Sequence, residues 1–274
     1  MMEMPTQGVL FTKDLKQRID YKRIKDVYEF YISYGEPKLI DDCTKVNYKK
    51  VSNECLKMPY NQFINYLYAE GYIDEKLNSM KKMSEILSQQ DESGFAIGNI
   101  TDKATEHSYD ILYDNILSKY RNKEITLLEI GIWHGGSALL WQEYFKKGKL
   151  VFLDIESRVS DETWKSINKN RFELHLMDAF TKEGVEWVQL LYPNGFDIII
   201  DDAPHTLESQ IFTIQNYTKL LRKGGILIIE DIQHFENASI IMESIGNIPH
   251  KSCEVVDLRP IKNRYDDVVI VVKK

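Results

Sequence analysis

The chain has 274 residues, of which 43% are hydrophobic and 28% are charged, so it can fold into one or two domains with a substantial core. This composition excludes an intrinsically disordered chain, a collagen and a disulfide-rich scaffold. The 42 acidic and 35 basic residues give a net charge of −7, whereas proteins that bind nucleic acid without sequence preference are usually basic. We therefore expect no nucleic-acid partner.

Cysteine usage and hydropathy narrow the class further. Cys43, Cys55 and Cys253 are odd in number and far apart, and no Cys-x-x-Cys pair occurs, which predicts reduced thiols instead of a zinc site or a disulfide framework. No apolar run reaches the roughly 18 residues of a membrane-spanning helix. The first residues are too polar for a secretory signal. The sequence thus predicts a soluble, cytoplasmic protein with no membrane partner.

Residues 1–97 differ in composition from the rest of the chain, being rich in Lys, Tyr and Asp with few β-branched runs. The spacing of apolar residues predicts helices over 15–34, 60–69 and 74–90. We interpret residues 1–97 as a helical cap or an oligomerisation arm, which would suit a homo-oligomer. The same helices would also serve as a scaffold with no further role. Residues 98–274 are predicted to form a second domain.

From residue 125 onward, short apolar runs alternate with amphipathic stretches. Apolar strands separated by helices predict a parallel sheet covered on both faces. The last two strands have only a loop between them and should pair antiparallel. The pattern is that of a Rossmann-like class I methyltransferase, an α/β fold with a mostly parallel seven-stranded sheet and a terminal antiparallel strand. Strands are predicted over 126–130, 150–155, 172–177, 196–201, 225–230, 254–258 and 268–272, and helices over 137–145, 160–168, 181–191, 207–221 and 236–245.

Five consecutive predicted strands end at acidic residues. Ligands of open α/β sheets bind beyond the carboxyl ends of the strands, which all meet at one rim. Placing this many acids on one rim concentrates repulsion there, so we interpret the set as a binding site and not as a solvated surface. The acids are Glu129, Asp154, Asp178, Asp201 with Asp202, and Glu230 with Asp231.

The loop after the first strand reads Glu-Ile-Gly-Ile-Trp-His-Gly-Gly-Ser over 129–137. Gly131 and Gly135 permit a close approach of backbone to ligand, and the helix starting near Ser137 presents free N–H groups. Trp133 stands where a Gly-x-Gly-x-x-Gly dinucleotide fingerprint needs its middle glycine. The broken fingerprint argues against a dinucleotide-dependent oxidoreductase.

Two further acids indicate an adenosine cofactor. Asp154 ends the second strand, where an acid can accept hydrogen bonds from ribose hydroxyls, in NAD and S-adenosylmethionine alike. Asp178 and Ala179 follow the third strand and would flank the adenine. Asp178 could equally serve as a helix N-cap. These residues indicate adenosine binding without deciding the reaction.

The fourth and fifth strands are predicted to bring Asp202, Glu230 and Asp231 together. Three carboxylates in one cleft repel one another unless they are protonated or neutralised by a cation. Oxygen ligands suit a hard ion such as Mg²⁺. His205, three residues after Asp202, could reach the same cavity as a metal ligand or a general base. The alternative is a helix-capping histidine paired with a nearby carboxylate.

At these residues the sequence resembles the metal-dependent sugar O-methyltransferases of macrolide tailoring, of the mycinamicin and tylosin type, over about residues 98–235. The Asp-Asp-x-x-His motif is the most specific feature, because a Glu-Asp pair follows 28 positions after its second Asp. Ala203 and Pro204 stand where family members often have Gly-Ser. The motifs are Thr-Asp-Lys at 101–103 with His107 and Tyr109, the Gly-rich loop 129–137, and 201–205 with 230–231.

The resemblance implies S-adenosylmethionine as methyl donor and Mg²⁺ held by Asp202, Glu230 and Asp231. It implies that His205 is the catalytic base, with Asp202 beside it. Lys103 would contact the donor carboxylate, or else be an ordinary solvated lysine, and Asp201 would orient the amino-acid part of the donor or the metal ligands. The predicted cofactor-binding residues are Thr101, Lys103, Glu129, Gly131, Gly135, Ser137, Asp154, Asp178 and Asp201.

The predicted function is therefore O-methylation of a hydroxyl on a sugar or a glycan or natural-product precursor, with His205 deprotonating a metal-chelated diol. Methylation of another small metabolite or a capsule precursor is an alternative, as is a cephalosporin-hydroxylase-like tailoring reaction. A non-enzymatic, donor-binding assembly protein and an RNA methyltransferase are also compatible with the fold. The acidic charge balance argues against the last of these.

Overall fold

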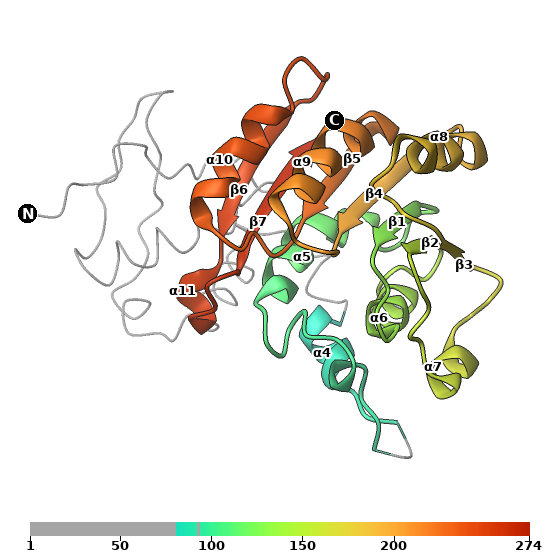
Figure 1. Ribbon diagram of the computed structural model, residues 1–274. Coiled ribbons are helices and arrows are strands. Elements are labelled where there is room, and N and C mark those ends of the chain that lie inside the picture. The colour runs from blue at the N-terminus through green and yellow to red at the C-terminus, as the bar shows by residue number, and fades with distance from the viewer. Residues whose placement is uncertain (1–80, 92–93) are drawn as a thin grey trace, which may run out of the picture. The chain divides into compact units, whose positions relative to one another are not determined.

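The computed structural model describes residues 81–91 and 94–274, and Lys82–Lys274 form one compact unit (Figure 1). The helices predicted over 15–34 and 60–69 lie outside the described residues. Within the third predicted helix, 74–90, the structure has helix α4, Met83–Ser88. The role predicted for residues 1–97 stays a prediction.

A seven-stranded sheet lies at the centre of this unit. Its strands are β1 (Thr126–Ile130), β2 (Lys149–Asp154), β3 (Phe172–Leu176), β4 (Phe196–Asp201), β5 (Leu221–Ile229), β6 (Ser252–Asp257) and β7 (Val268–Lys273). They are ordered β3-β2-β1-β4-β5-β7-β6. The first five strands are parallel, and β7 runs antiparallel between β5 and β6. The predicted Rossmann-like methyltransferase sheet with a terminal antiparallel strand is confirmed.

Helices cover both faces of the sheet. The remaining helices are α5 (Tyr109–Leu117), α6 (Gly136–Tyr144), α7 (Asp161–Ser166), α8 (Lys182–Leu191), α9 (Leu207–Asn216), α10 (Phe235–Ser244) and α11 (Arg259–Lys262). Figure 1 shows α8, α9 and α10 along one side of the strands, and their apolar residues share one core with them. Helix α5 and the short α11 were not among the predicted elements.

The prediction placed the boundary between α9 and β5 too late in the chain. The helix predicted over 207–221 ends at Asn216, and a 3-10 turn, Tyr217–Leu220, completes it. Strand β5 begins at Leu221, where the prediction had it begin at 225, because Leu221 already pairs with Phe196 across a register shift. The polar Arg-Lys-Gly-Gly sequence in between reads as a turn, but it is an irregular strand segment.

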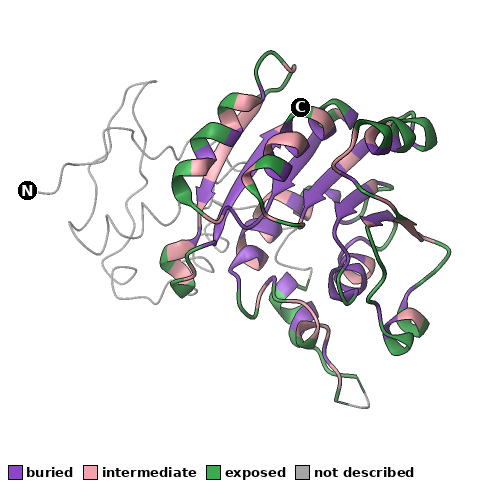
Figure 2. Cartoon of the chain, viewed as in Figure 1, coloured by how far each residue is buried: buried purple, intermediate pink, exposed green. Residues whose placement is uncertain are grey.

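The central strands β1, β2, β4, β5 and β7 are largely buried, the edge strands β3 and β6 are partly exposed, and the outward sides of the helices are exposed (Figure 2). Side chains alternate across the sheet, so Leu128 and Ile130 enter the core beside Ile214 of α9. Glu129, between them, faces the opposite side and accepts a hydrogen bond from the Trp141 indole of α6 at 2.8 Å. The Glu129 carboxylate therefore lies on the face of the sheet that α6 covers.

Glycines allow the loops at the carboxyl ends of the strands to pack closely against one another. Gly131 has φ +96°, and a Cβ there would lie 2.4 Å from the carbonyl oxygen of Asp202. Gly136 would place a Cβ 2.1 Å from the carbonyl oxygen of Ile100. Only glycine permits such approaches, which bring the loop after β4 and the segment before α5 against the glycine-rich loop. In the part of the chain that the structure describes, no helix is long and apolar enough to cross a membrane.

Candidate active site

Two cavities open at the carboxyl ends of the strands. The first has a volume of about 780 Å³ and extends over the ends of β2 and β3. The second has a volume of about 680 Å³ and is lined by residues 98–102 and by the glycine-rich loop. Both include Gly131, Trp133, Asp202 and His205. Two ligands bound in the two cavities would meet at these shared residues.

His205 lies between two carboxylates at this junction. Its Nε2 is 3.9 Å from Asp202 Oδ1 and 3.5 Å from Asp231 Oδ2. The ligand atoms of these three residues all lie within 4.8 Å of one another, which is compact enough to hold a metal ion. The structure thus brings together the ends of β4 and β5 as the sequence predicts.

Lys103 lies behind Asp202 and is fully buried. Its Nζ is 2.6 Å from Glu230 Oε2, 2.8 Å from Asp202 Oδ2 and 3.4 Å from Glu129 Oε1. Burial works against the ammonium form, but attraction by Asp202, Glu230 and Glu129 outweighs it and raises the pKa of Lys103 well above its usual value. The side chain is therefore a permanent cation among three carboxylates.

Tyr109 and His107 lie behind Asp231. The Tyr109 hydroxyl donates to Asp231 Oδ1 and accepts from the Asp231 backbone N–H at 3.2 Å. His107 stacks on the Tyr109 ring, and its Nδ1 is 3.4 Å from Asp231 Oδ1 and 2.6 Å from Asp267 Oδ1. Burial opposes the charged ring, yet the hydrogen bond to Asp267 and the charge of Asp231 raise the pKa of His107.

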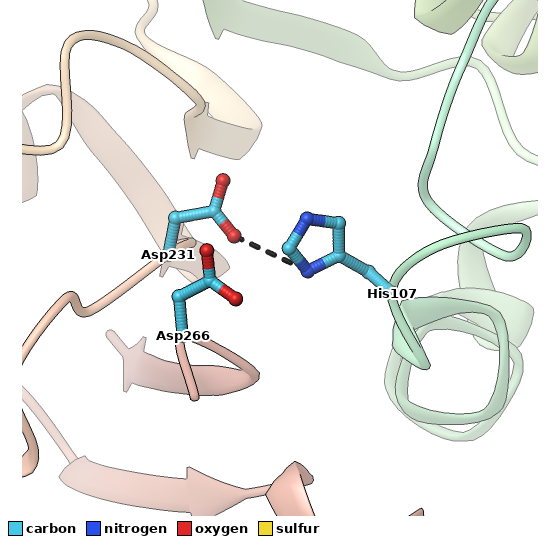
Figure 3. Close-up of side chains that lie close together, drawn as sticks. All are labelled: His107, Asp231 and Asp266. Atoms are coloured by element: carbon cyan, nitrogen blue, oxygen red, sulfur yellow. Dashed lines mark ion pairs between the residues drawn. The ribbon is translucent and has the colours of Figure 1, made fainter. Parts of the chain in front are cut away.

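Figure 3 shows that His107 and Asp266 both approach Asp231, a second arrangement with the compactness of a metal site. Its ligand atoms are already engaged. The Arg264 guanidinium donates to both Asp266 oxygens, at 3.1 and 3.3 Å, and Tyr109 donates to Asp231. We therefore interpret this cluster as internal support for Asp231 and not as a metal centre.

The residues at the junction fit a divalent cation. Asp202 Oδ1 and Asp231 Oδ2 are the oxygens that face His205. Glu230 Oε1 is buried and has no hydrogen-bond partner among the described residues. Burial raises the pKa of Glu230 to about 7, against the opposing pull of Lys103. The outward-facing oxygens of Asp202 and Asp231 match the hard ligands that Mg²⁺ prefers, and the buried Glu230 Oε1 is a further oxygen without a partner behind them.

Three residues of the junction have a left-handed backbone, at φ +45° for Trp133, +61° for His205 and +53° for Asp231. Such a conformation costs a non-glycine residue of the order of 1–3 kcal/mol and persists only where surrounding structure enforces it. Within residues 81–91 and 94–274, only one other non-glycine residue, Asn263, has a positive φ. The strain is thus concentrated at the site, where it directs the His205 and Asp231 side chains toward each other.

The predicted adenosine-binding acids line the first cavity. Asp154 Oδ2 accepts the backbone N–H groups of Ile132 at 2.9 Å and Trp133 at 3.4 Å, which ties the glycine-rich loop to β2. Asp178 accepts the N–H of Phe180 at 2.8 Å. Asp178 is not the cap of α8, because Thr181 is. Met177, Phe180 and Phe212 add apolar surface to the same cavity.

Other predicted cofactor-binding residues lie elsewhere. Thr101 and Ser137 line the second cavity, and Gly135 caps α6. Lys103, Glu129, Asp201 and Glu230 line neither cavity. Burial raises the pKa of Glu129 to about 7 and that of Asp201 to about 8. Lys103 and Glu129 lie beneath the two cavities, where the Lys103 ammonium contacts carboxylates, and their predicted contact with the donor stays a prediction.

Sequence reasoning gave no role to three residues that the geometry makes prominent. His107 and Tyr109 were part of a motif, but their support of Asp231 depends on a fold contact 122 residues away for Tyr109. Trp133 is 59% exposed between the cavities, with the Arg158 guanidinium 4.4 Å from its ring centre. A large aromatic residue inside a glycine-rich loop was the available signal for Trp133.

Comparisons with known proteins identify the type of domain that carries these residues. Residues 128–232 match a methyltransferase domain. The chain is 31% identical over 133 residues to demethylmacrocin O-methyltransferase of Streptomyces fradiae, and 27% identical over 135 residues to mycinamicin VI 2''-O-methyltransferase of Micromonospora griseorubida. Each match covers 46% of this chain and 32% of the relative. The chain thus spans about a third of the length of these relatives.

A solved structure of the mycinamycin-pathway methyltransferase MycE, in complex with Mg, SAH and mycinamycin VI, superposes with a TM-score of 0.54. The two sequences are 21% identical, and the match covers 82% of this chain and 64% of MycE. At 21% identity, the superposition supports a shared fold and no more than that. The resemblance to macrolide sugar O-methyltransferases that the motifs indicate is confirmed by the sequence matches.

Proposed function

We propose that this chain, which carries a methyltransferase domain over residues 128–232, transfers a methyl group from S-adenosylmethionine to a sugar hydroxyl with the help of a divalent cation. The observation that carries the proposal is the junction of the two cavities. There His205 Nε2 lies 3.5 Å from Asp231 Oδ2, beside a glycine-rich loop. A base, a cation site and two ligand cavities meet at one point.

The donor would occupy the first cavity. Asp154 lies at the end of β2, where its carboxylate can take the ribose hydroxyls, and the apolar group of Met177, Phe180 and Phe212 suits the adenine. Gly131 lets the glycine-rich loop pack against the Asp202 backbone, and this contact places the loop beside the cavity that the donor would occupy. The sulfonium methyl would then point toward the second cavity.

The acceptor would occupy the second cavity, against Asp202, His205 and Asp231. A bound Mg²⁺, held by Asp202, Asp231 and Glu230, would supply the Lewis acidity that lowers the pKa of a chelated hydroxyl. His205 would accept the hydroxyl proton at Nε2 as the oxygen–carbon bond forms and the carbon–sulfur bond breaks. Holding both reactants in line supplies much of the remaining acceleration.

A sugar is the acceptor class that the relatives favour. They are O-methyltransferases of demethylmacrocin, of mycinamicin VI and of 8-demethyl-8-alpha-L-rhamnosyl tetracenomycin C. For this chain, the sugar acceptor, the dependence on Mg²⁺ and the cytoplasmic location are parts of the proposal. The methylation of another small metabolite or a capsule precursor would use the same residues on a different acceptor.

The test is a methyl-transfer assay on the full chain, with product mass read by mass spectrometry. We expect a mass gain of one methyl group on glycosylated acceptors, dependent on S-adenosylmethionine and abolished by chelation of divalent cations. Calorimetry should show that the donor binds without added metal. Absence of donor binding would contradict the proposal, and binding of NAD(P)H, seen by absorbance, would favour an oxidoreductase. A gel shift with RNA would favour an RNA methyltransferase.

A further inference from the structure

We propose that the Lys103 ammonium is a resident cation that takes the place of a second metal ion between Glu129, Asp202 and Glu230. The site would then use one exchangeable divalent cation, on the open side of Asp202. This inference rests on the proposed function only in assuming that a divalent cation binds at Asp202 and Asp231.

The position of Lys103 Nζ is that of a coordinated ion. Its three carboxylate neighbours come from the ends of β1, β4 and β5, which are adjacent in the sheet. Its ammonium donates hydrogen bonds to Asp202 Oδ2 and Glu230 Oε2, and Glu129 Oε1 lies 3.4 Å away as an ion-pair partner. The side chain is 1% exposed and borders neither cavity, so no ligand in the cleft reaches it.

The carboxylates need this charge. Glu129 and Glu230 are completely buried, and without a cation such groups would take up protons or repel one another. One ammonium does not balance three carboxylates, and Asp231 adds a fourth acid on the open side. Asp202 and Asp231 therefore still present carboxylate oxygens on the open side, where the exchangeable cation would bind.

Asp202 connects the two cation positions. Its Oδ2 accepts from Lys103 at 2.8 Å, while Oδ1 faces His205 at 3.9 Å. Asp231 shows the same division, since Tyr109 holds Oδ1 and Oδ2 faces His205. Residues 103–109 thus hold the inner oxygen of each carboxylate and leave the outer oxygens for the exchangeable ion.

The test compares the full chain with Lys103→Met, which keeps the length of the side chain and removes its charge. Lys165→Met, on the exposed side of α7, is the matched control. Bound Mn²⁺ is counted by electron paramagnetic resonance, and thermal unfolding is followed with Mg²⁺ and with a chelator. A double variant, Lys103→Met with Glu230→Gln, removes one of the carboxylates that lose their cation.

We expect the wild type and Lys165→Met to bind one Mn²⁺ and Lys103→Met to bind two. Lys103→Met should unfold at lower temperature in chelator and regain about 5 °C or more in Mg²⁺. Unchanged Mn²⁺ stoichiometry together with a Mg²⁺ effect equal to that of the wild type would overturn the inference. If Lys103→Met does not fold, recovery by Mg²⁺ or by Glu230→Gln supports it, and recovery by neither overturns it.

The two proposals fail in different ways. A wild type that binds no Mn²⁺ while Lys103→Met binds one would contradict the metal dependence of the proposed function and support the resident cation. A wild type that binds Mn²⁺ and transfers methyl groups, with Lys103→Met showing neither an added ion nor Mg²⁺-dependent stability, would leave the proposed function in place and remove this inference.

Discussion

The acids at the strand ends form one series in the sequence but two groups in the structure. Asp154 and Asp178, after β2 and β3, accept backbone N–H groups of nearby loops and line the first cavity. Glu129, Asp202 and Glu230, at the carboxyl ends of β1, β4 and β5, surround the buried ammonium of Lys103. The first group fixes the backbone of nearby loops by hydrogen bonds, and the second group forms ion pairs with a buried cation.

The difference follows from what lies opposite each strand end. The strands β2 and β3 end beside loops with free N–H groups, which stabilise a carboxylate without a counterion. The strands β1, β4 and β5 end beside residues 103–109. This segment supplies the Lys103 ammonium, which contacts Glu230, and the Tyr109 hydroxyl, which contacts Asp231. The acids at the strand ends therefore form two regions. In one region they accept hydrogen bonds from uncharged backbone N–H groups, and in the other they contact a cation.

Asp202→Asn should produce the largest effect, because Asp202 belongs to both cation positions. We expect methyl transfer to fall by at least about 10³-fold, since a metal that polarises a hydroxyl supplies several kcal/mol of transition-state stabilisation. Mn²⁺ binding should be lost and donor affinity should stay within about threefold, as measured by calorimetry. Asp161→Asn, exposed on α7, is the control. Full activity in Asp202→Asn would contradict the division of the strand-end acids into a backbone-binding group and a cation-binding group.

His205→Gln separates proton transfer from metal binding. We expect the rate to fall about 10²- to 10⁴-fold, which is the range of a lost general base, while the donor binds as before. His250→Gln, an exposed histidine far along the chain, controls for a loss of imidazole as such. Loss of Mn²⁺ binding with little change in the rate at saturating metal would instead make His205 a metal ligand.

The fold could be predicted from sequence because its determinants are local. The apolar runs of β1 and β4 are short and bounded by turn residues, so the strands at 126–130 and 196–201 were predicted with correct bounds. The start of β5 could not be predicted, because Leu221 pairs with Phe196 of β4 across a register shift and the residues that follow it, 222–225, lack an apolar strand pattern.

The site could be predicted only in outline. Strand-end acids and the Asp202 to Asp231 spacing are visible in the sequence. The position of Lys103 is not, because it depends on contacts with residues 99 and 127 positions away. A lysine in a polar motif reads as solvated or ligand-binding, and only the folded sheet edge shows that three carboxylates surround it. The same holds for Tyr109, whose partner follows β5.

Asp154→Asn tests the backbone-organising group. The amide keeps one acceptor for Ile132 N–H but loses the charge that would take the ribose hydroxyls. We expect donor affinity to fall about 10-fold, which corresponds to the loss of about one charge-assisted hydrogen bond, with Mn²⁺ binding unchanged. Calorimetry with the donor and Mn²⁺ titration give the two readouts. A change in Mn²⁺ affinity equal to that in donor affinity would contradict the division of the rim.

Asp110→Asn tests a partly buried carboxylate that lies outside the Lys103 cluster. Burial and the neighbouring Asp114 raise the pKa of Asp110 to about 6, with Lys262 opposing. The unfolded chain loses this proton near pH 4 while the folded chain keeps it to about pH 6, so the group destabilises the fold as pH rises through this window. Asn removes that cost.

We therefore expect Asp110→Asn to raise the free energy of unfolding by about 1–3 kcal/mol at pH 7.5 and by little below pH 4, as measured by denaturant titration across pH. Asp161→Asn, which changes an exposed carboxylate on α7, is the control variant. An equal gain at both pH values would assign the effect to packing. A pH-dependent gain would instead show that the ionised carboxylate of Asp110, buried beside Asp114, destabilises the fold.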